Sequence, residues 1–240
     1  MVSKARAWLR VRATRALASL DRNVTLRDRV VGEWAHGLRS GSIVLDVGAG
    51  TCKYRALFAH CEYRAHDHPA VSYGEADIRG EITSIPLPSE SLDAILCTEV
   101  LEHVPDPIGA VQEMARLLRP DGRLLLTVPA ACRVHRVPTH FWGGFAPDFF
   151  HQILPQRGLA VDELRPLGNW SQFMAQELGR LPQMVRENTA LPFRRVLSAL
   201  LWPGFRVAVP LALLGFSRLE NSEDLPLGWI CFARKSSHDT

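Results

Sequence analysis

The residues that could most clearly bind a ligand follow a short apolar run near position 45. Residues 43–47 are mostly apolar and partly β-branched, and Gly48-Ala49-Gly50 comes directly after them. Glycines at the end of a strand let the backbone turn sharply and let a ligand approach it closely. The start of a following helix would direct free N–H groups at that ligand. The sequence therefore predicts a nucleotide-type binding loop at Gly48, Ala49 and Gly50.

Two details separate this loop from a dinucleotide-binding loop. The dinucleotide fingerprint G-x-G-x-x-G needs a third glycine, and Lys53 occupies that position. In addition, Asp46 lies shortly before Gly48. Its carboxylate can bind amides of the loop or accept a hydrogen bond from a ligand ammonium group, whereas it would repel a pyrophosphate. We expect Asp46 to take part in the site together with the loop.

A second acid lies at the spacing that an adenosine site requires. Asp67 ends the run 63–67, about 20 residues after Asp46. An acid at this position accepts hydrogen bonds from both ribose hydroxyls. The alternative is a solvated turn acid between His66 and His68. We expect Asp67, with His68 beside it, to bind a ribose.

Two further pairs of residues are expected around the crevice that the glycine loop and Asp67 border at the strand ends. Asp77-Ile78 can hydrogen-bond an adenine amino group and pack on the face of its ring, or form an ordinary turn. Thr98-Glu99 follows the apolar run 92–97. Because the carboxyl ends of parallel strands meet at one edge of a sheet, we expect Thr98 and Glu99 to overhang the crevice.

Predicted strands and predicted helices, which would position these residues, alternate along the chain. Apolar runs of strand length are separated by segments with helical spacing, and Asp106-Pro107 is a typical helix start. Strands that are apolar on both faces indicate a mostly parallel sheet covered on both sides, that is, a Rossmann-like α/β sandwich of three layers. The expected strands are 43–47, 63–67, 92–98, 123–128, 158–164 and 227–234, and the expected helices are 1–39, 53–60, 106–118 and 145–154.

Composition restricts the classes of protein that remain. The 240 residues are 47% hydrophobic and 22% charged, which suits one well-filled domain, with or without an appendage, and excludes a disordered chain. A net charge of +3 gives no sign of a nucleic-acid binder. Five scattered cysteines without a C-x-x-C pair predict neither a disulfide framework nor a zinc site. We therefore expect no metal and a reducing cytoplasm.

The chain is expected to comprise four segments. These are a basic helical cap at 1–41, the core at 42–168, a helical insertion at 169–226, and a final strand with a tail at 227–240. The cap either packs on the core or rests on an anionic membrane surface as an amphipathic helix. In the insertion, 196–216 is apolar but contains two prolines and Arg206. This favours a buried helical pair, or an amphipathic surface for a membrane or a lipid-like substrate, over a transmembrane span.

In this order and at this spacing, the residues resemble the class I S-adenosylmethionine-dependent methyltransferases, and within them the type-11 group. The shared stretches, within residues 42–168, are 44–51, 77–78, 87–88, 91–94, 100–104 and 117–122. The resemblance implies a seven-stranded sheet whose last strand is antiparallel. It also implies S-adenosyl-L-methionine as the cofactor, with its methionine part over the glycine loop, its ribose on Asp67 and its adenine near Asp77-Ile78.

Two stretches, 53–58 and the segment after Pro129, resemble more closely the methyltransferases of bacterial surface-polysaccharide and glycolipid clusters. Those proteins have a D-x-x-R-[YF]-[TS] motif after the fifth strand. Here 140–146 stands in its place, so His140 replaces the acid. The resemblance implies O-methylation of a sugar, glycolipid or related metabolite. The basic and apolar segments at 1–41 and 180–220 favour an acceptor held at the cytoplasmic face of the membrane, and a soluble small-molecule acceptor is the alternative. We therefore expect a cytoplasmic protein, with peripheral contact to the inner membrane face in the first case.

A hydroxyl acceptor also needs a base, and a histidine suits this role near neutral pH. The candidates are His103, His135 and His140. His140 lies where the acceptor should enter, so it is the first candidate, with packing or simple substrate contact as the alternative. For His103, whose motif shapes the end of a strand, a structural role competes with a catalytic one.

Two other functions remain open. An NAD-dependent oxidoreductase would use a similar sheet, but Lys53 and the absence of a Tyr-x-x-x-Lys pair disfavour it. A catalytically inactive homologue that only binds the cofactor is the second, because 140–146 lacks the acceptor motif. Methylation of nucleic acid is not expected, because the sequence has no N-P-P-Y-type tetrapeptide.

Overall fold

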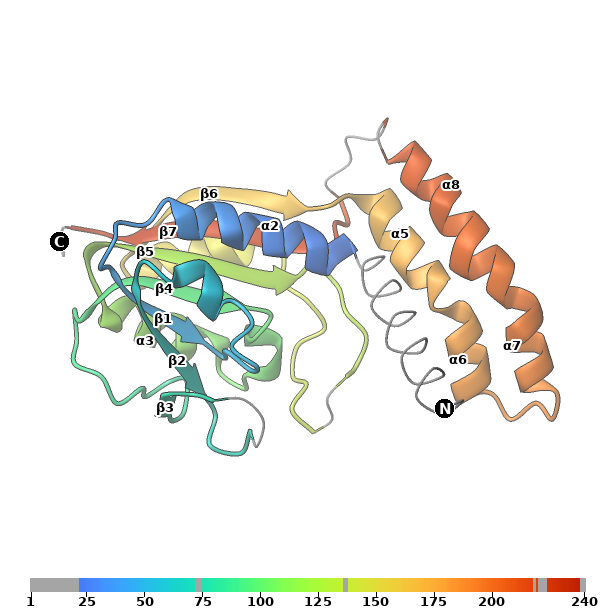
Figure 1. The fold of residues 1–240 in the computed structure, drawn as a ribbon, viewed down its shortest axis with the longest axis horizontal. Helices are drawn as coiled ribbons and strands as arrows, with labels where there is room; N and C mark the ends of the chain where they lie inside the picture. Colours follow the sequence, from blue (N-terminus) through green and yellow to red (C-terminus); the bar gives the residue numbers. More distant parts are fainter. Residues whose placement is uncertain (1–21, 72–74, 136–137, 218, 220–223, 238–240) are drawn as a thin grey trace, which may run out of the picture. The chain divides into compact units, whose positions relative to one another are not determined.

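The computed structural model describes residues 22–71, 75–135, 138–217, 219 and 224–237, which belong to two compact units (Figure 1). We call residues 28–166 with 228–240 the sheet unit, and residues 1–27 with 167–227 the helical unit. These boundaries fall after Arg27, Pro166 and Leu227, and the predicted segment boundaries lie after residues 41, 168 and 226. Residues 1–21 of the predicted helix 1–39 lie outside the described residues.

The sheet unit is built on seven strands. They are β1 (Ile43–Val47), β2 (Glu62–Asp67), β3 (Ile78–Arg79), β4 (Leu92–Thr98), β5 (Leu118–Pro129), β6 (Leu159–Leu167) and β7 (Gly228–Lys235). Their order in the sheet is β3-β2-β1-β4-β5-β7-β6. The pairs from β3 to β5 are parallel, and β7 runs antiparallel to β5. The predicted mostly parallel α/β sheet with an antiparallel last strand is confirmed.

Helices and helical turns flank this sheet. They are α2 (Arg22–His36), η1 (Arg55–Phe58), η2 (Leu101–His103), α3 (Pro107–Leu117), η3 (Phe149–Ile153) and α4 (Leu154–Gln156). α3 begins where the sequence predicted it. The Asp106 side chain accepts a hydrogen bond from the Gly109 N–H at 2.8 Å, and Pro107 occupies the first helical position.

Two predicted helices differ from the observed ones. The segment 53–60 contains only the 3-10 turn η1, and Cys52 just before this segment has a left-handed backbone (φ 54°). The segment 145–154 is π-helical over η3 and continues into α4. Pro155 has no N–H to donate to the carbonyl of His151, so regular α-helical bonding is broken there.

The central strands are buried on both faces. Val44 and Leu45 of β1 are fully buried, and successive side chains of a strand point to opposite faces. Leu45 belongs to the apolar cluster that α3 and α4 complete with Met114 and Leu154. On the other side, the Trp34 ring of α2 meets the buried Phe58 ring edge-on, with 6.1 Å between centroids. The continuous apolar runs in the sequence therefore correspond to a sheet with two covered faces.

The helical unit contains two antiparallel helical segments joined by a short loop. Their parts are α5 (Trp170–Gly179), α6 (Leu181–Asn188), α7 (Arg194–Pro203), η4 (Gly204–Ala208) and α8 (Val209–Phe216). α5 packs against α8, and α6 packs against α7 (Figure 1). The Ser198 hydroxyl donates to the Pro182 carbonyl at 2.7 Å, which joins α7 to α6.

The predicted buried helical pair within 196–216 was wrong. Arg194–Phe216 is one continuous helix of 23 residues, and only 6% of its most apolar window is buried. The π-helical turn η4 lies between Pro203 and Pro210 and accommodates both prolines. Among the described residues, this helix is the one that is long and apolar enough to cross a membrane.

Candidate active site

The predicted site residues lie where parallel strands end. Gly48 follows β1, Asp67 ends β2, and Thr98 ends β4. β1 pairs in parallel with both β2 and β4, so these three carboxyl ends lie side by side at one edge of the sheet (Figure 1). This edge is where open α/β sheets bind ligands.

The loop after β1 has a backbone that only glycine adopts without strain. Gly48 and Gly50 have φ values of 69° and 57°. The N–H groups of Gly48 and Ala49 donate to the His66 carbonyl at 2.9 and 3.0 Å, which fixes the loop to β2. A Cβ atom at Gly48 would lie 2.5 Å from a methyl group of Val100. Both the turn and the contact with Val100 therefore require glycine at position 48.

Asp67 joins the end of β2 to the glycine loop. Its carboxylate accepts the Gly50 N–H at 2.9 Å and the His68 N–H at 2.8 Å, one on each oxygen. Each carboxylate oxygen has a second lone pair, so two acceptor positions remain for a ligand diol. The His68 side chain lies 2.9 Å from the Glu81 carboxylate and accepts the Ala70 N–H at 3.1 Å. The structure thus brings Asp67 and the backbone of His68, but not the ring of His68, to the loop.

Asp46 is buried beside the loop and is 2% exposed. The Tyr63 hydroxyl donates to its carboxylate at 2.6 Å. Burial raises the pKa of Asp46 to about 7; the hydrogen bond from Tyr63 opposes this shift, and the charge of Asp67 adds to it. A cation placed beside Asp46 would favour its ionised form. Tyr63 was not among the predicted site residues, although the strand pairing of Asp46 with Ala65 places Tyr63 on the same face.

Asp77 lies at the outer edge of the sheet. Its carboxylate accepts the Ala65 N–H at 2.8 Å and pairs with the Arg55 guanidinium at 3.1 Å. Ile78 is half-buried and pairs with His66 in the ladder between β2 and β3. In the described part of the chain, no hydrogen bond of Asp77 reaches the glycine loop or Asp67. Adenine binding by Asp77 and Ile78 stays a prediction.

Thr98 and Glu99 end β4 beside the loop. Glu99 has a left-handed backbone (φ 55°), which is uncommon for a residue with a side chain and costs of order 1 kcal/mol. The Glu99 N–H donates to the Thr127 carbonyl at 2.9 Å, and the Thr127 hydroxyl donates to the Glu99 carboxylate at 3.1 Å. Thr98 pairs with Thr127 in the parallel ladder. β5 therefore holds Glu99 in a strained conformation at the carboxyl edge.

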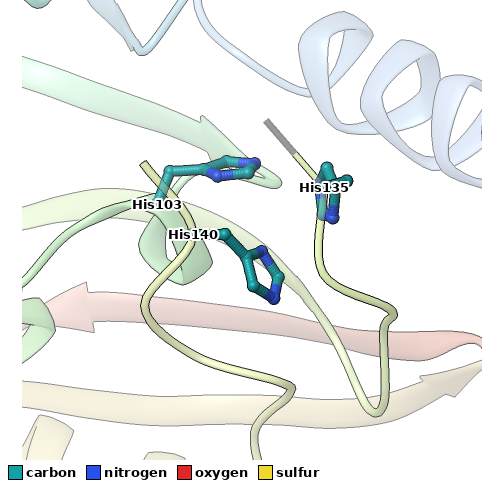
Figure 2. Close-up of side chains that lie close together, drawn as sticks. All are labelled: His103, His135 and His140. Atoms are coloured by element: carbon teal, nitrogen blue, oxygen red, sulfur yellow. The ribbon is translucent and has the colours of Figure 1, made fainter. Parts of the chain in front are cut away.

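The three candidate bases come together in space, although His103 lies about 30 residues before the other two in the sequence (Figure 2). His103 ends η2, whereas His135 and His140 belong to the loop after β5. The ring centroids of His103 and His135, and those of His135 and His140, are both 4.7 Å apart. The centroids of His103 and His140 are 5.9 Å apart. The structure thus brings both predicted catalytic histidines, His103 and His140, into one cluster.

Hydrogen bonds fix the loop after β5 against the end of β4. The N–H groups of Phe141 and Trp142 donate to the Glu102 carbonyl at 2.9 and 3.2 Å. The Trp142 indole donates to the Val104 carbonyl at 2.9 Å. At the base of the loop, the Phe145 N–H donates to the Pro129 carbonyl at 3.0 Å. The position of His140 is therefore set by its neighbours in the loop.

Comparison with known proteins supports a methyltransferase. Residues 45–126 match the family described as "Methyltransferase domain". An uncharacterized methyltransferase of Mycobacterium sp. (strain JLS) is 38% identical over 97 residues, which are 36% of this chain and 38% of that protein. A ubiquinone biosynthesis O-methyltransferase of Xanthomonas oryzae pv. oryzae (strain PXO99A) is 45% identical over 51 residues, which are 21% of this chain and 19% of that protein. The chain thus matches well under half the length of these curated relatives.

The fold also matches solved structures. The crystal structure of the [4+2]-cyclase SpnF has a TM-score of 0.56 and 17% sequence identity, over 88% of this chain and 82% of that one. At this identity the likeness shows a shared fold alone. The family match covers the glycine loop, Asp67 and the end of β4, and supports S-adenosyl-L-methionine as the cofactor of the sheet unit. Residues 45–126 thus carry the sequence pattern of a methyltransferase domain.

Proposed function

We propose that the chain is an S-adenosyl-L-methionine-dependent methyltransferase that methylates an oxygen of a sugar, a glycolipid or a related metabolite. The observation that carries this proposal is the junction of Asp67 with the glycine loop at the carboxyl edge of a methyltransferase-type sheet. The O-methyltransferase name of one relative supports oxygen as the methylated atom.

The residues at this edge fit the proposed cofactor. Bound there, S-adenosyl-L-methionine supplies an electrophilic methyl group on a sulfonium sulfur. The Asp67 carboxylate has acceptor positions for a vicinal diol, and the buried Asp46 offers a negative partner for an ammonium group. The glycine loop lets a ligand approach the backbone closely. The chain thereby orients the reactants, and orientation alone lowers a barrier by roughly 7–11 kcal/mol.

The cofactor site is tested by calorimetry with S-adenosylhomocysteine. We expect Asp67→Asn to weaken binding at least about 10-fold, because charge-assisted hydrogen bonds contribute roughly 1.5–3 kcal/mol each. The matched control is Asp162→Asn, which changes an exposed acid of β6 that pairs with Arg234. NAD is titrated in parallel. Binding of NAD but not of S-adenosylhomocysteine, or equal affinity in Asp67→Asn, would contradict the assignment.

The helical unit bears on the nature of the acceptor. Arg194–Phe216 is long and apolar enough to cross a membrane, and Arg194 and Arg195 are exposed at its start. Exposed apolar surface beside basic residues suits the boundary of an anionic membrane. We therefore propose that this helix holds the protein at such a membrane, where an amphiphilic acceptor is carried. The large apolar side chains that it exposes are Val196, Leu200, Trp202, Val207, Leu211 and Phe216.

Flotation with vesicles of phosphatidylcholine and phosphatidylglycerol tests this second step. We expect the wild type to float, and Leu200→Glu with Leu211→Glu to abolish flotation, because both side chains are largely exposed. Ile108→Glu is the control, since it introduces the same charge at an exposed apolar residue of the sheet unit. If the double variant floats as well as the wild type, the helix does not hold the protein at the membrane.

A further inference from the structure

The histidine cluster offers three nitrogen ligands at one point. One ring nitrogen each of His103, His135 and His140 lies within 4.8 Å of the other two (Figure 2). The rings come from two elements that lie side by side, the turn after β4 and the loop after β5. Three imidazoles that converge in this way match the ligand set of a catalytic zinc site, in which a fourth position stays open.

Hydrogen bonds set the tautomers of two of these rings. The Nδ1 atom of His103 lies 2.6 Å from the Thr139 carbonyl, and the Nδ1 atom of His135 lies 2.8 Å from the Arg133 carbonyl. A carbonyl oxygen only accepts, so Nδ1 carries a proton in both rings, and Nε2 carries the lone pair when the ring is neutral. Donation from the second ring nitrogen to a carbonyl is the usual way in which a protein orients a metal-binding histidine.

The third ring has an unsatisfied atom. His140 Nδ1 is buried and has no hydrogen-bond partner among the described residues. A buried polar atom without a partner costs roughly 1–3 kcal/mol, and such an atom in a native structure indicates a missing ligand or a functional role. The Glu102 carboxylate lies 3.8 Å from His103 Nε2, which places negative charge beside the cluster. Both observations favour a cation at this point.

We propose that His103, His135 and His140 bind one divalent transition-metal ion of the zinc class. Three neutral nitrogen donors suit zinc, whereas magnesium and calcium prefer oxygen donors. Zinc–nitrogen bonds of about 2.0–2.1 Å imply ligand atoms roughly 3.3 Å apart at tetrahedral angles. The three ligand atoms, which lie within 4.8 Å of one another, therefore have to approach further when an ion binds. This site departs from the expectation of no metal, which rested on cysteine spacing.

The consequence for catalysis rests on the proposed function. The acceptor hydroxyl would occupy an open position on the ion, which lowers its pKa so that its proton passes to water. The same nitrogen lone pair cannot bind a metal and take up a proton. His103 and His140 therefore act as metal ligands rather than as general bases. The site lies next to the cofactor loop, because the His103 N–H donates to the carbonyl of Val100, which contacts Gly48.

Metal binding is tested without any acceptor. The full chain is freed of metal with a chelator and titrated with zinc chloride by calorimetry, and with cobalt chloride by visible absorption. We expect one ion per chain and the intense absorption of tetrahedral cobalt. Loss of an outer partner of a metal ligand costs about 10–100-fold in affinity, so His140→Ala and His135→Ala should each weaken zinc binding at least about 100-fold. His135 is exposed, so its replacement leaves the fold intact.

His151→Ala is the control variant, because His151 is an exposed histidine outside the cluster. It should bind zinc as the wild type does. Equal zinc affinity in wild type, His135→Ala and His140→Ala would overturn the site. S-adenosylhomocysteine is titrated into the same metal-free protein. Cofactor binding without zinc binding refutes this site alone, and zinc binding without cofactor binding refutes the proposed function alone.

Discussion

The buried Asp46 makes the stability of this protein depend on pH in a direction opposite to that of most acids. Its carboxyl is 2% exposed and accepts one hydrogen bond, from the Tyr63 hydroxyl at 2.6 Å. Burial raises its pKa from 3.8 to about 7, against the hydrogen bond from Tyr63. Asp46→Asn removes this titration and keeps an oxygen that can accept from Tyr63.

The sign and size of the effect follow from linkage. A carboxyl whose folded pKa is raised contributes stability that is fully present below its unfolded pKa of 3.8 and is lost as the pH rises through about 7. A shift of about 3 pKa units corresponds to about 4 kcal/mol, because one unit is 1.36 kcal/mol. Between about pH 5 and about pH 8 the loss is about 3 kcal/mol. Asp46→Asn removes this pH-dependent loss of folding stability, because asparagine does not titrate.

Urea unfolding of wild type and Asp46→Asn at these two pH values measures the effect. We expect the variant to gain about 3 kcal/mol relative to the wild type when the pH rises from about 5 to about 8. Asp162→Asn, at an exposed acid, should show no comparable change. Parallel stability curves for wild type and Asp46→Asn over this range would refute the reasoning. In that case water or a rearranged loop solvates the carboxylate.

Two other substitutions test the glycine loop and the buried Glu113 of α3. Gly48→Ala should cost about 1–3 kcal/mol and abolish S-adenosylhomocysteine binding, because φ is 69° and the new Cβ would lie 2.5 Å from Val100. Gly32→Ala, in a helix with open space around it, is the control, and thermal unfolding with calorimetry compares the two. Glu113 is buried, yet the hydrogen bonds and charge of Arg116 hold its pKa below the usual value. Glu113→Gln should therefore cost about 1–3 kcal/mol in urea unfolding at neutral pH and have less effect as the pH falls through that pKa; equal stability would contradict this.

The sheet could be predicted because its signals are local. Each central strand is a short apolar run bounded by a turn, and burial on both faces makes the run continuous. The errors arose in helices, where apolar spacing does not show which hydrogen-bond pattern the backbone adopts. The helix expected at 53–60 is only the 3-10 turn η1. A π-helical turn let the two prolines stay within one helix over Arg194–Phe216, which composition alone does not show.

The features of the site that could be predicted are also local, and those that were missed depend on distant contacts. The positions of the glycine loop and Asp67 at neighbouring strand ends could be predicted, because the strands and their spacing are visible in the sequence. Tyr63 was missed, because its contact with Asp46 depends on the pairing of two strands. The meeting of His103 with His135 and His140 was also missed. It depends on the path of the loop after β5, which no periodicity in the sequence predicts.

In the proposed reaction, the cofactor and the acceptor also depend on different parts of the chain. The family match ends at residue 126, before His135 and His140. The fold is shared with a [4+2]-cyclase, so the sheet does not determine the chemistry. What this chain does to its acceptor therefore depends on the loop after β5, which Glu102 and Val104 hold by hydrogen bonds. This chain lacks the acid and the arginine of the related motif. A metal bound there would explain how an acceptor is activated without them, because the ion would supply a positive charge beside the acceptor.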